Sequence, residues 1–160
     1  MKKILISLLA LCMIAVLLLG AVSCNPAATE QPDTSGAGNE GASQKSEAEL
    51  VWETAAYREN TTFGEGSKTV NVIVKYMEYA VTFTVRTDAE MLGNALLAHG
   101  LIAGEEGAYG LYVKTVNGIL ADYDIDQSYW SLEQNGQALF TGIDSTPIVD
   151  GATYEIVYTK

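Results

Sequence analysis

Two stretches of alternating apolar and polar residues begin the folded part of the chain. They cover residues 69–76 and 79–86, and in each the apolar side chains recur at nearly every second position. A period of two is typical of strands that bury one face, so the pattern predicts two strands. Because only Met77-Glu78 separates them, we expect an antiparallel hairpin. A further strand is expected before them, at Val51–Tyr57.

A helical pattern follows the second of these strands. Thr87 and Glu90 have the spacing of a capping box, in which two side chains satisfy free amide groups at the start of a helix. The apolar residues between 91 and 96 then share one helical face. Gly100 offers the left-handed conformation that ends many helices. We therefore expect one amphipathic helix, packed across the hairpin.

The rest of the chain consists of short predicted strands joined by turns. The elements expected there are a loop at 104–110, strands at 111–117, 129–134, 138–140 and 153–159, an acidic loop at 122–127, and turns at Asn117-Gly118, Asn135-Gly136 and Asp150-Gly151. With the first hairpin and the helix, the order is ββ-α-βββ. One mixed sheet that holds a single packed helix is an α+β fold, and we predict a β-grasp-like arrangement of that class.

The first 24 residues have the features of an export signal. Lys2 and Lys3 precede an apolar run at 4–19, as in a secretory signal peptide. The next segment, Ala21–Cys24, resembles the lipobox of bacterial lipoproteins, which implies a signal peptide at 1–23 and a lipid on the Cys24 thiol. The alternative is an uncleaved membrane helix, because the apolar run is near the length that spans a bilayer. In both cases the rest of the chain is expected on the outer face of the cytoplasmic membrane.

Residues 24–49 have the composition of a linker. They include no aromatic residue and are rich in alanine, glycine, serine and glutamate, so they cannot bury enough apolar surface to fold. We expect a lipidated, disordered linker at 24–49 and one folded domain at 50–160. Both cysteines, Cys12 and Cys24, precede that domain. The domain therefore has no disulfide and no thiolate metal site.

Charge and residue content argue against several classes of function. The chain has 9 basic and 20 acidic residues and a net charge of −11, whereas nucleic acids and anionic lipids are bound through clustered lysine and arginine. One histidine and no cysteine in the domain leave no evident pair of nucleophile and base. A phosphate-binding glycine loop is also absent from the sequence. The sequence thus predicts neither a nucleic-acid-binding protein nor an enzyme.

Two features have a superficial likeness to metal sites. His99 falls at the end of the predicted helix, where we expect a partly buried histidine favoured by the helix dipole rather than a ligand. Asp122–Asp126 partly follows the spacing of a calcium loop, with Glu133 at the twelfth position, but Gln127 stands where such a loop needs glycine. We predict a solvated acidic loop and no metal site, with weak calcium binding as the alternative.

Two adjacent aromatic residues, Tyr129 and Trp130, lie in one predicted strand. Neighbouring side chains of a strand point to opposite faces of its sheet, so one ring is expected in the core and the other at the surface. The tyrosine-rich strands around them indicate either an aromatic core or a platform for a planar ligand or a partner protein. Exposed aromatic side chains suit a platform, because they give a large contact area at a low cost in entropy.

Six short motifs occur in an order that resembles a known family. They are Thr87-Asp88, Val116–Ile119, Tyr129-Trp130, Asn135-Gly136, Gly142–Asp144 and Asp150-Gly151. Over residues 68–160 the chain resembles the bacterial transcobalamin-like C-terminal domains, a family of unknown function found on lipoproteins and surface proteins of Firmicutes. The resemblance implies a β-grasp-like binding module, because the corresponding domain of the cobalamin carriers closes over one face of the corrinoid.

The same resemblance implies where a ligand would bind. The implied residues are Tyr129 and Trp130, together with Asn117 and Gly118 of one loop and Gly142 and Ile143 of another. Cobalamin is the implied ligand, and no cofactor is required. The chain departs from the carriers because it lacks the large helical barrel that holds most of their ligand, and His99 matches no cobalt-ligating motif.

We therefore expect a membrane-tethered, non-catalytic binding module outside the cytoplasm. It would capture cobalamin, another corrinoid or another small molecule, or present it to a transport protein. The alternative is a domain that binds surface proteins or the cell wall without a small ligand. A deep pocket beside Tyr129 or Trp130 would favour the first function, and a flat sheet with buried aromatic side chains would favour the second.

Overall fold

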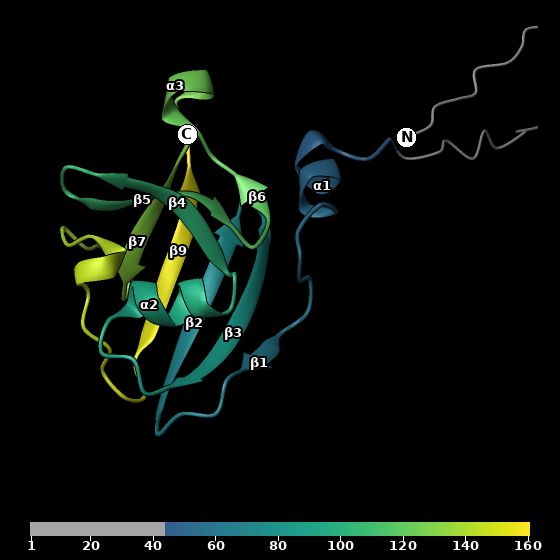
Figure 1. The fold of residues 1–160 in the computed structure, drawn as a ribbon. Coiled ribbons are helices and arrows are strands. Elements are labelled where there is room, and N and C mark those ends of the chain that lie inside the picture. Colours follow the sequence, from purple (N-terminus) through teal and green to yellow (C-terminus); the bar gives the residue numbers. More distant parts are fainter. Residues whose placement is uncertain (1–43) are drawn as a thin grey trace, which may run out of the picture. The chain divides into compact units, whose positions relative to one another are not determined.

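The computed structural model describes residues 44–160 (Figure 1). The predicted signal peptide, the predicted lipid-attachment residue Cys24 and most of the predicted linker lie outside the described residues. Within 44–160, no helix is long and apolar enough to cross a membrane.

Six strands form the larger sheet, in the order β1-β3-β2-β9-β7-β8 (Figure 1). They are β1 (Thr61–Phe63), β2 (Lys68–Tyr76), β3 (Tyr79–Thr87), β7 (Tyr129–Gln134), β8 (Gln137–Ala138) and β9 (Thr153–Thr159). The predicted hairpin is confirmed, since β2 and β3 pair antiparallel from Lys68 opposite Thr87 to Tyr76 opposite Tyr79. β9 lies parallel to β2 and antiparallel to β7, so the C-terminal strand joins the hairpin to the β7–β8 edge.

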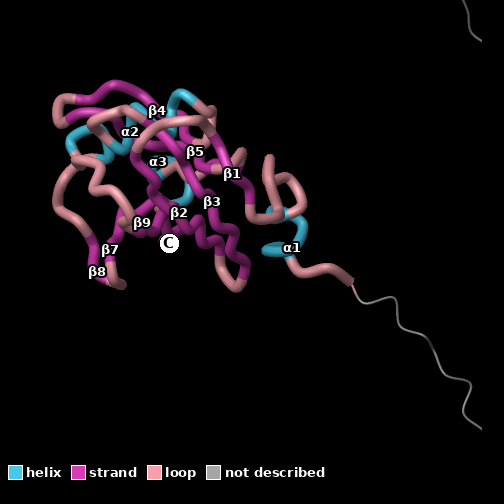
Figure 2. The backbone as a smooth tube through the Cα atoms, turned by 90° about the horizontal axis from the view of Figure 1, so that it is seen from below, coloured by secondary structure: helices cyan, strands magenta, loops and turns pink. Residues whose placement is uncertain are grey.

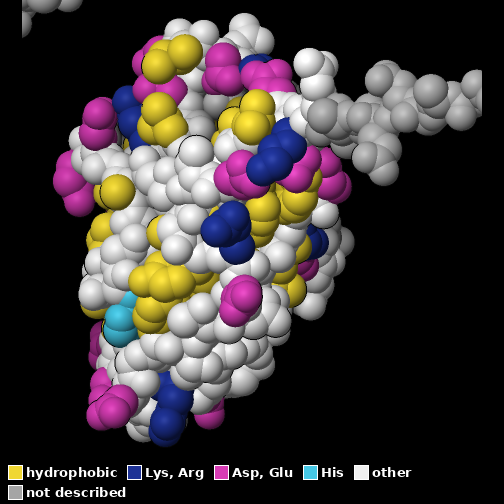
Figure 3. All heavy atoms as spheres, turned by 90° about the vertical axis from the view of Figure 1, so that its right-hand side faces the viewer, with side chains coloured by type: hydrophobic (Ala, Val, Ile, Leu, Met, Phe, Trp, Pro, Cys, Tyr) yellow, Lys and Arg dark blue, Asp and Glu magenta, His cyan; other side chains and the backbone are white. Residues whose placement is uncertain are grey.

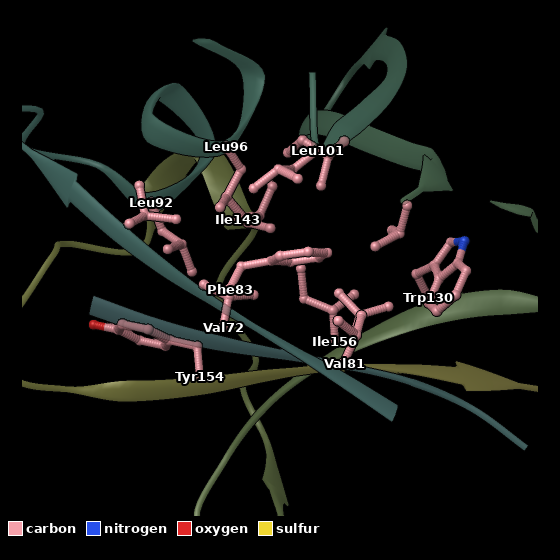
Figure 4. Close-up of a cluster of buried hydrophobic side chains, with 14 of the residues drawn as sticks. Val72, Val81, Phe83, Leu92, Leu96, Leu101, Trp130, Ile143, Tyr154 and Ile156 are labelled. Carbon is pink, nitrogen blue, oxygen red and sulfur yellow. The ribbon is translucent and has the colours of Figure 1, made fainter. Parts of the chain in front are cut away.

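The larger sheet buries one face. Along β2 the valines and Tyr76 are buried, while the residues between them are partly exposed. Helix α2 (Leu92–Ala98) and a second, smaller sheet cover this face (Figure 1). Figure 4 shows the core between these layers, with Leu96 facing Phe83. Each large apolar side chain buried there contributes about 1.5–3 kcal/mol, so this core is the main source of stability.

The smaller sheet consists of β4 (Ile102–Gly107), β5 (Gly110–Val116) and β6 (Ile119–Leu120). The prediction of a loop at 104–110 is wrong, because these residues form the end of β4, the turn and the start of β5 in the β4–β5 hairpin. Five of the six residues of β4 are exposed, so β4 has no apolar alternation that could reveal it. Pairing with β5 holds β4 extended, and that partner cannot be recognised from the residues of β4 themselves.

Helix α2 begins later than the capping box predicts. The Thr87 hydroxyl accepts a hydrogen bond from the Ala89 amide at 3.0 Å, and no bond joins Thr87 to Glu90 among the described residues. The first helical residue is Leu92. The residues before it stay extended because Met91 pairs with Pro147 in an isolated antiparallel bridge. A tertiary contact therefore overrides the local capping signal.

The predicted strand at Val51–Tyr57 is also wrong, because helix α1 (Glu47–Trp52) covers its beginning. Ser46 caps this helix by accepting a hydrogen bond from a backbone amide of the first turn at 3.1 Å. Trp52 is buried, and its ring stacks on that of Tyr79 with a centroid distance of 5.4 Å. Helical spacing thus places the tryptophan against the end of the larger sheet.

The α+β fold class is confirmed, with two sheets in place of one. The predicted acidic loop contains a short helix, α3 (Tyr123–Asp126), and a 3-10 helix, η1 (Ile143–Ser145), follows β8. Figure 2 shows α1 beside the end of the β2–β3 hairpin, whereas β7 and β8 lie at the opposite edge.

Candidate functional site

A cavity of about 360 Å³ lies between the two sheets, next to β7 and β8. We call it the inter-sheet cavity. Its lining residues are Leu111, Tyr112, Val113, Tyr129, Trp130, Ser131, Leu132, Ala138, Leu139, Thr141, Gly142, Ile143 and Ile156. None of these side chains is charged. The cavity therefore suits an uncharged ligand, because a charged group would lose its hydration there without gaining a counter-charge.

The two adjacent aromatic residues of β7 lie on opposite faces, as predicted. Trp130 is 9% exposed, whereas Tyr129 is 40% exposed. Cross-strand pairing explains this, since Trp130 lies opposite Tyr158 of β9 and shares its core face. The two rings meet edge to face with a centroid distance of 5.5 Å. Tyr129 instead contacts Tyr123 of α3, with a centroid distance of 6.5 Å.

Trp130 also offers unused hydrogen-bonding groups. Its indole Nε1 is buried and has no hydrogen-bond partner among the described residues, which ordinarily costs about 1–3 kcal/mol. The Leu132 carbonyl points away from β9 and accepts a hydrogen bond from the Leu139 amide at 2.8 Å. The backbone N–H and C=O of Trp130, two residues earlier in the strand, point to the same side of β7. β8 pairs with β7 only at Glu133 and Gln134. The backbone edge of β7 at Trp130 is therefore open to a ligand.

The loop after β8 forms a second wall and is held rigidly. The Thr146 hydroxyl donates to the Gly142 carbonyl at 2.9 Å, and one Asp144 carboxylate oxygen accepts from the Leu111 amide at 3.2 Å. A Cβ at Gly142 would lie 2.7 Å from the other oxygen of that carboxylate, closer than real side chains approach. Glycine at 142 thus lets the loop close against β5, and Ile143 is buried behind it.

Exposed aromatic side chains border this cavity. Phe140 is fully exposed and lies between Leu139 and Thr141, which both line the cavity. Tyr109 is fully exposed as well, at the tip of the β4–β5 hairpin, and its carbonyl lies 3.8 Å from the position of a Cβ on Gly142. Large apolar side chains in full contact with water often mark a contact surface.

Asn117 and Gly118 lie elsewhere. Asn117 is 1% exposed, and its side chain bonds to both backbone groups of Tyr57, accepting from the amide at 2.9 Å and donating to the carbonyl at 2.7 Å. A Cβ on Gly118 would lie 3.2 Å from the Ala56 amide nitrogen. These two residues fasten the segment after α1 to the smaller sheet, and neither lines the inter-sheet cavity.

Of the residues implied by the family resemblance, Tyr129, Trp130, Gly142 and Ile143 are thus brought together. Sequence reasoning missed the wall contributed by β5, at Leu111–Val113, because it depends on how the two sheets face each other. The prediction of a strand at 138–140 is wrong at its end, because β8 stops at Ala138 and Phe140 lies in the loop that follows. The place of Phe140 beside the cavity depends on that loop, which the sequence alone does not reveal.

The features that resemble metal sites have structural roles in the described residues. Half-buried His99 ends α2, where Gly100 has the predicted positive φ of 64°, and its ring lies 5.4 Å from that of Phe63. Asp122 accepts from the backbone at the start of α3, at 3.1 Å. Asp126 bonds to Lys160 at 2.8 Å, and this bond, with those from Ser128, lowers the pKa of Asp126 to about 2. Within 44–160, no group of three or more metal-binding side chains is close enough to hold an ion.

Comparison with known proteins gives one family match and two similar solved structures. Residues 89–160 match the model of a domain of unknown function, DUF4430. The crystal structure of a Ruminococcus gnavus protein, provisionally described as metal-binding, is similar with a TM-score of 0.56 and 34% identity over 59% of this chain and 98% of that one. Haptocorrin in complex with Cbi gives a TM-score of 0.46 and 26% identity, over 61% of this chain. The chain spans 26% of haptocorrin. No curated protein matches it.

Proposed function

Since the chain belongs to the same family as the Ruminococcus gnavus protein and carries a DUF4430 domain, we propose that it is a non-catalytic module that binds an uncharged small molecule. The observation that carries this proposal is the inter-sheet cavity, which is lined by aromatic and aliphatic side chains and by no charged one. Its volume of about 360 Å³ falls within the range of small-molecule sites.

Trp130 would fix the orientation of the ligand. Its indole N–H and the open backbone edge of β7 are polar groups within an otherwise apolar wall. Sites of this kind obtain affinity from the apolar surface and specificity from a few placed hydrogen bonds. A ligand that carries a carbonyl or amide oxygen would satisfy the buried indole donor.

A corrinoid such as cobalamin is the ligand we put first. The support is the order of sequence motifs shared with the transcobalamin-like domains, four of whose implied residues line the cavity. A corrinoid is larger than the cavity, so one edge would enter it while the rest lay against Tyr112 and Phe140. The metal binding attributed to the Ruminococcus gnavus protein is not proposed for this chain, because residues 44–160 hold no cluster of ligating side chains.

We further propose that the chain is a lipoprotein tethered by Cys24 to the outer face of the cytoplasmic membrane. The support is the cationic start, the apolar run and the small residues before Cys24. Labelling cells with a radioactive fatty acid would test this. Label on the wild-type chain that disappears in Cys24→Ala is the expected result, and label that persists in Cys24→Ala would contradict the tether.

A second candidate function is contact with a surface protein or the cell wall. The fully exposed side chains of Tyr109 and Phe140 favour it, because exposed aromatic residues are typical of the centres of protein interfaces. Replacement of both by serine should then abolish contact with the partner while leaving small-molecule binding at the cavity largely intact.

The ligand proposal is tested by a thermal-shift screen of the full-length chain in a neutral detergent. The ligands are cobalamin, cobinamide, haem and glycans, and a ligand at 100 times its dissociation constant should stabilise the fold by about 2.7 kcal/mol. Trp130→Leu should remove the shift, whereas Thr82→Val, on the opposite face of the larger sheet, should keep it. If no ligand shifts the midpoint, or if Trp130→Leu keeps the full shift, the inter-sheet cavity is not the site.

A further inference from the structure

A second cavity, of about 480 Å³, lies at the other end of the same sheet face. We call it the α1 cavity, because α1 forms one of its walls, with the β2–β3 turn, β6, α3 and the C-terminal residue forming the others. Figure 3 shows the face of the molecule that carries α1, where acidic, basic and hydrophobic side chains lie next to one another. The proposed function makes no use of this cavity.

Two tyrosines form an aromatic corner in the α1 cavity. Tyr76 of β2 and Tyr158 of β9 are neighbours across the parallel pair, and their rings lie 4.8 Å apart at an interplanar angle of 62°. Tyr76 lines the cavity and is only 6% exposed, and its hydroxyl makes no hydrogen bond within the described residues. By contrast, the hydroxyl of Tyr154, which is also buried, donates to a backbone carbonyl at 2.9 Å. The corner is therefore mostly shielded from water, while the Tyr76 hydroxyl still reaches solvent and has no partner in the described residues.

The rim of the α1 cavity carries excess negative charge. Asp126 is neutralised by Lys160, whose pKa is raised by the bond between them. Glu47 and Glu78 line the cavity and take part in no ion pair within residues 44–160. The pKa of the Tyr76 hydroxyl is raised, first by burial and then by its neighbours Tyr158 and Glu47, while Lys160 acts in the opposite direction.

This combination matches one class of ligand. Aromatic faces attract organic cations through their negative quadrupole, and the attraction is strongest where water is excluded. The apolar side chains Ala48, Val51 and Leu120 would contact the alkyl groups of such a cation. A bare metal ion fits poorly, because the described residues offer no group of three ligating side chains. We infer that the α1 cavity binds a small organic cation of the alkylammonium class, between the Tyr76–Tyr158 corner and the carboxylates of Glu47 and Glu78.

The inference can be tested with choline and its uncharged isostere, 3,3-dimethylbutan-1-ol. Isothermal titration calorimetry of the full-length chain in a neutral detergent, at constant ionic strength, compares the two probes. The shapes are nearly the same, so a difference in affinity reports the charge. Choline should bind about tenfold more tightly than the alcohol, as a partly desolvated cation–π contact predicts.

Matched variants separate local recognition from the general acidity of the chain. Glu47→Gln with Glu78→Gln should weaken choline binding about tenfold. Glu65→Gln with Glu106→Gln removes the same charge from exposed positions that line neither cavity, and should leave affinity unchanged. Equal affinity for the two probes, an equal loss in both double variants, or no binding of choline at millimolar concentration would each overturn the inference.

Discussion

The two cavities occupy the same face of the larger sheet but differ in chemistry. The inter-sheet cavity has no charged lining residue, whereas the α1 cavity has Glu47 and Glu78 on its rim. They adjoin at the cross-strand pair of Trp130 and Tyr158, one ring of which faces each cavity. Neighbouring aromatic side chains of β7 and β9 therefore line an uncharged cavity on one side and an acidic cavity on the other. The charges of Glu47, from α1, and Glu78, from the β2–β3 turn, distinguish the ligands that we propose for the two cavities.

The covering elements also differ in how they are attached. The inter-sheet cavity is closed by β5 and by the loop around Gly142, which contact each other through Asp144. The α1 cavity is closed by a six-residue helix whose main anchor is the stack of Trp52 on Tyr79. Short helices have little stability of their own, so the α1 cavity should be the easier of the two to disrupt.

The largest expected effect comes from removing the anchor of α1. Trp52→Ala should lower the free energy of unfolding by about 3–5 kcal/mol, the usual cost of deleting a buried large aromatic ring. Choline binding should be lost because α1 no longer closes its cavity, while corrinoid binding should persist. Urea denaturation and calorimetry measure the two effects. Leu50→Ala, on the exposed side of the same helix, is the control and should change neither.

An intermediate effect is expected at the inter-sheet cavity. Gly142→Ala places a Cβ 2.7 Å from an Asp144 oxygen, so the Asp144 carboxylate that joins this loop to β5 must shift. Corrinoid affinity should fall about tenfold, which corresponds to about 1.4 kcal/mol, and choline affinity should not change. Gly151→Ala is a suitable control. A Cβ at position 151 would meet no atom within 4 Å, and its only cost is the positive φ of Gly151. A parallel loss of choline binding would show that the two cavities are not independent.

The smallest effect concerns the ion pair in the wall of the α1 cavity. The pKa of Asp126 is lowered from 3.8 to about 2, chiefly by Lys160 and then by Ser128. The ionised form is favoured in the folded state, so the pair stabilises the fold above pH 3.8 and the benefit is lost as the pH falls toward 2. Asp126→Asn should therefore be slightly less stable than wild type at pH 6, and the difference should shrink as the pH falls from 3.8 toward 2.

Urea denaturation of the two chains at several pH values checks this dependence. Asp124→Asn is the control, because its side chain is exposed and forms no ion pair among the described residues. A difference between wild type and Asp126→Asn that is constant down to pH 2 would contradict the role of ionisation.

Local patterns of apolar and polar residues were sufficient to predict the strands that contact the core. The β2–β3 hairpin and the strands at 129–134 and 153–159 were predicted almost to the residue, because alternation and turn residues are encoded within each segment. β4 was missed because its exposed glycines and glutamates become a strand only through β5. α1 was predicted as a strand because Val51 and Trp52 are compatible with the spacing of a helix and with that of a strand. Its cap, Ser46, lies before the segment that was predicted as a strand.

The same distinction applies to the site. Tyr129 and Trp130 were suggested by their adjacency in one strand, and their different exposure follows from the pleat alone. The role of Asn117 could not be inferred locally, since its side chain bonds to the backbone of Tyr57, 60 residues earlier. Neither cavity could be anticipated as a volume, because each forms where segments distant in sequence meet.

Tryptophan fluorescence gives the most direct test of ligand binding in the inter-sheet cavity. The chain has two tryptophans, so Trp52→Phe leaves Trp130 as the reporter. Titration of this full-length variant with cyanocobalamin, corrected for absorption by the ligand, should give saturable quenching that choline in excess does not alter. Trp130→Phe, which keeps only Trp52, should show much weaker quenching. Quenching that never saturates, or that is the same in both variants, would contradict binding beside Trp130.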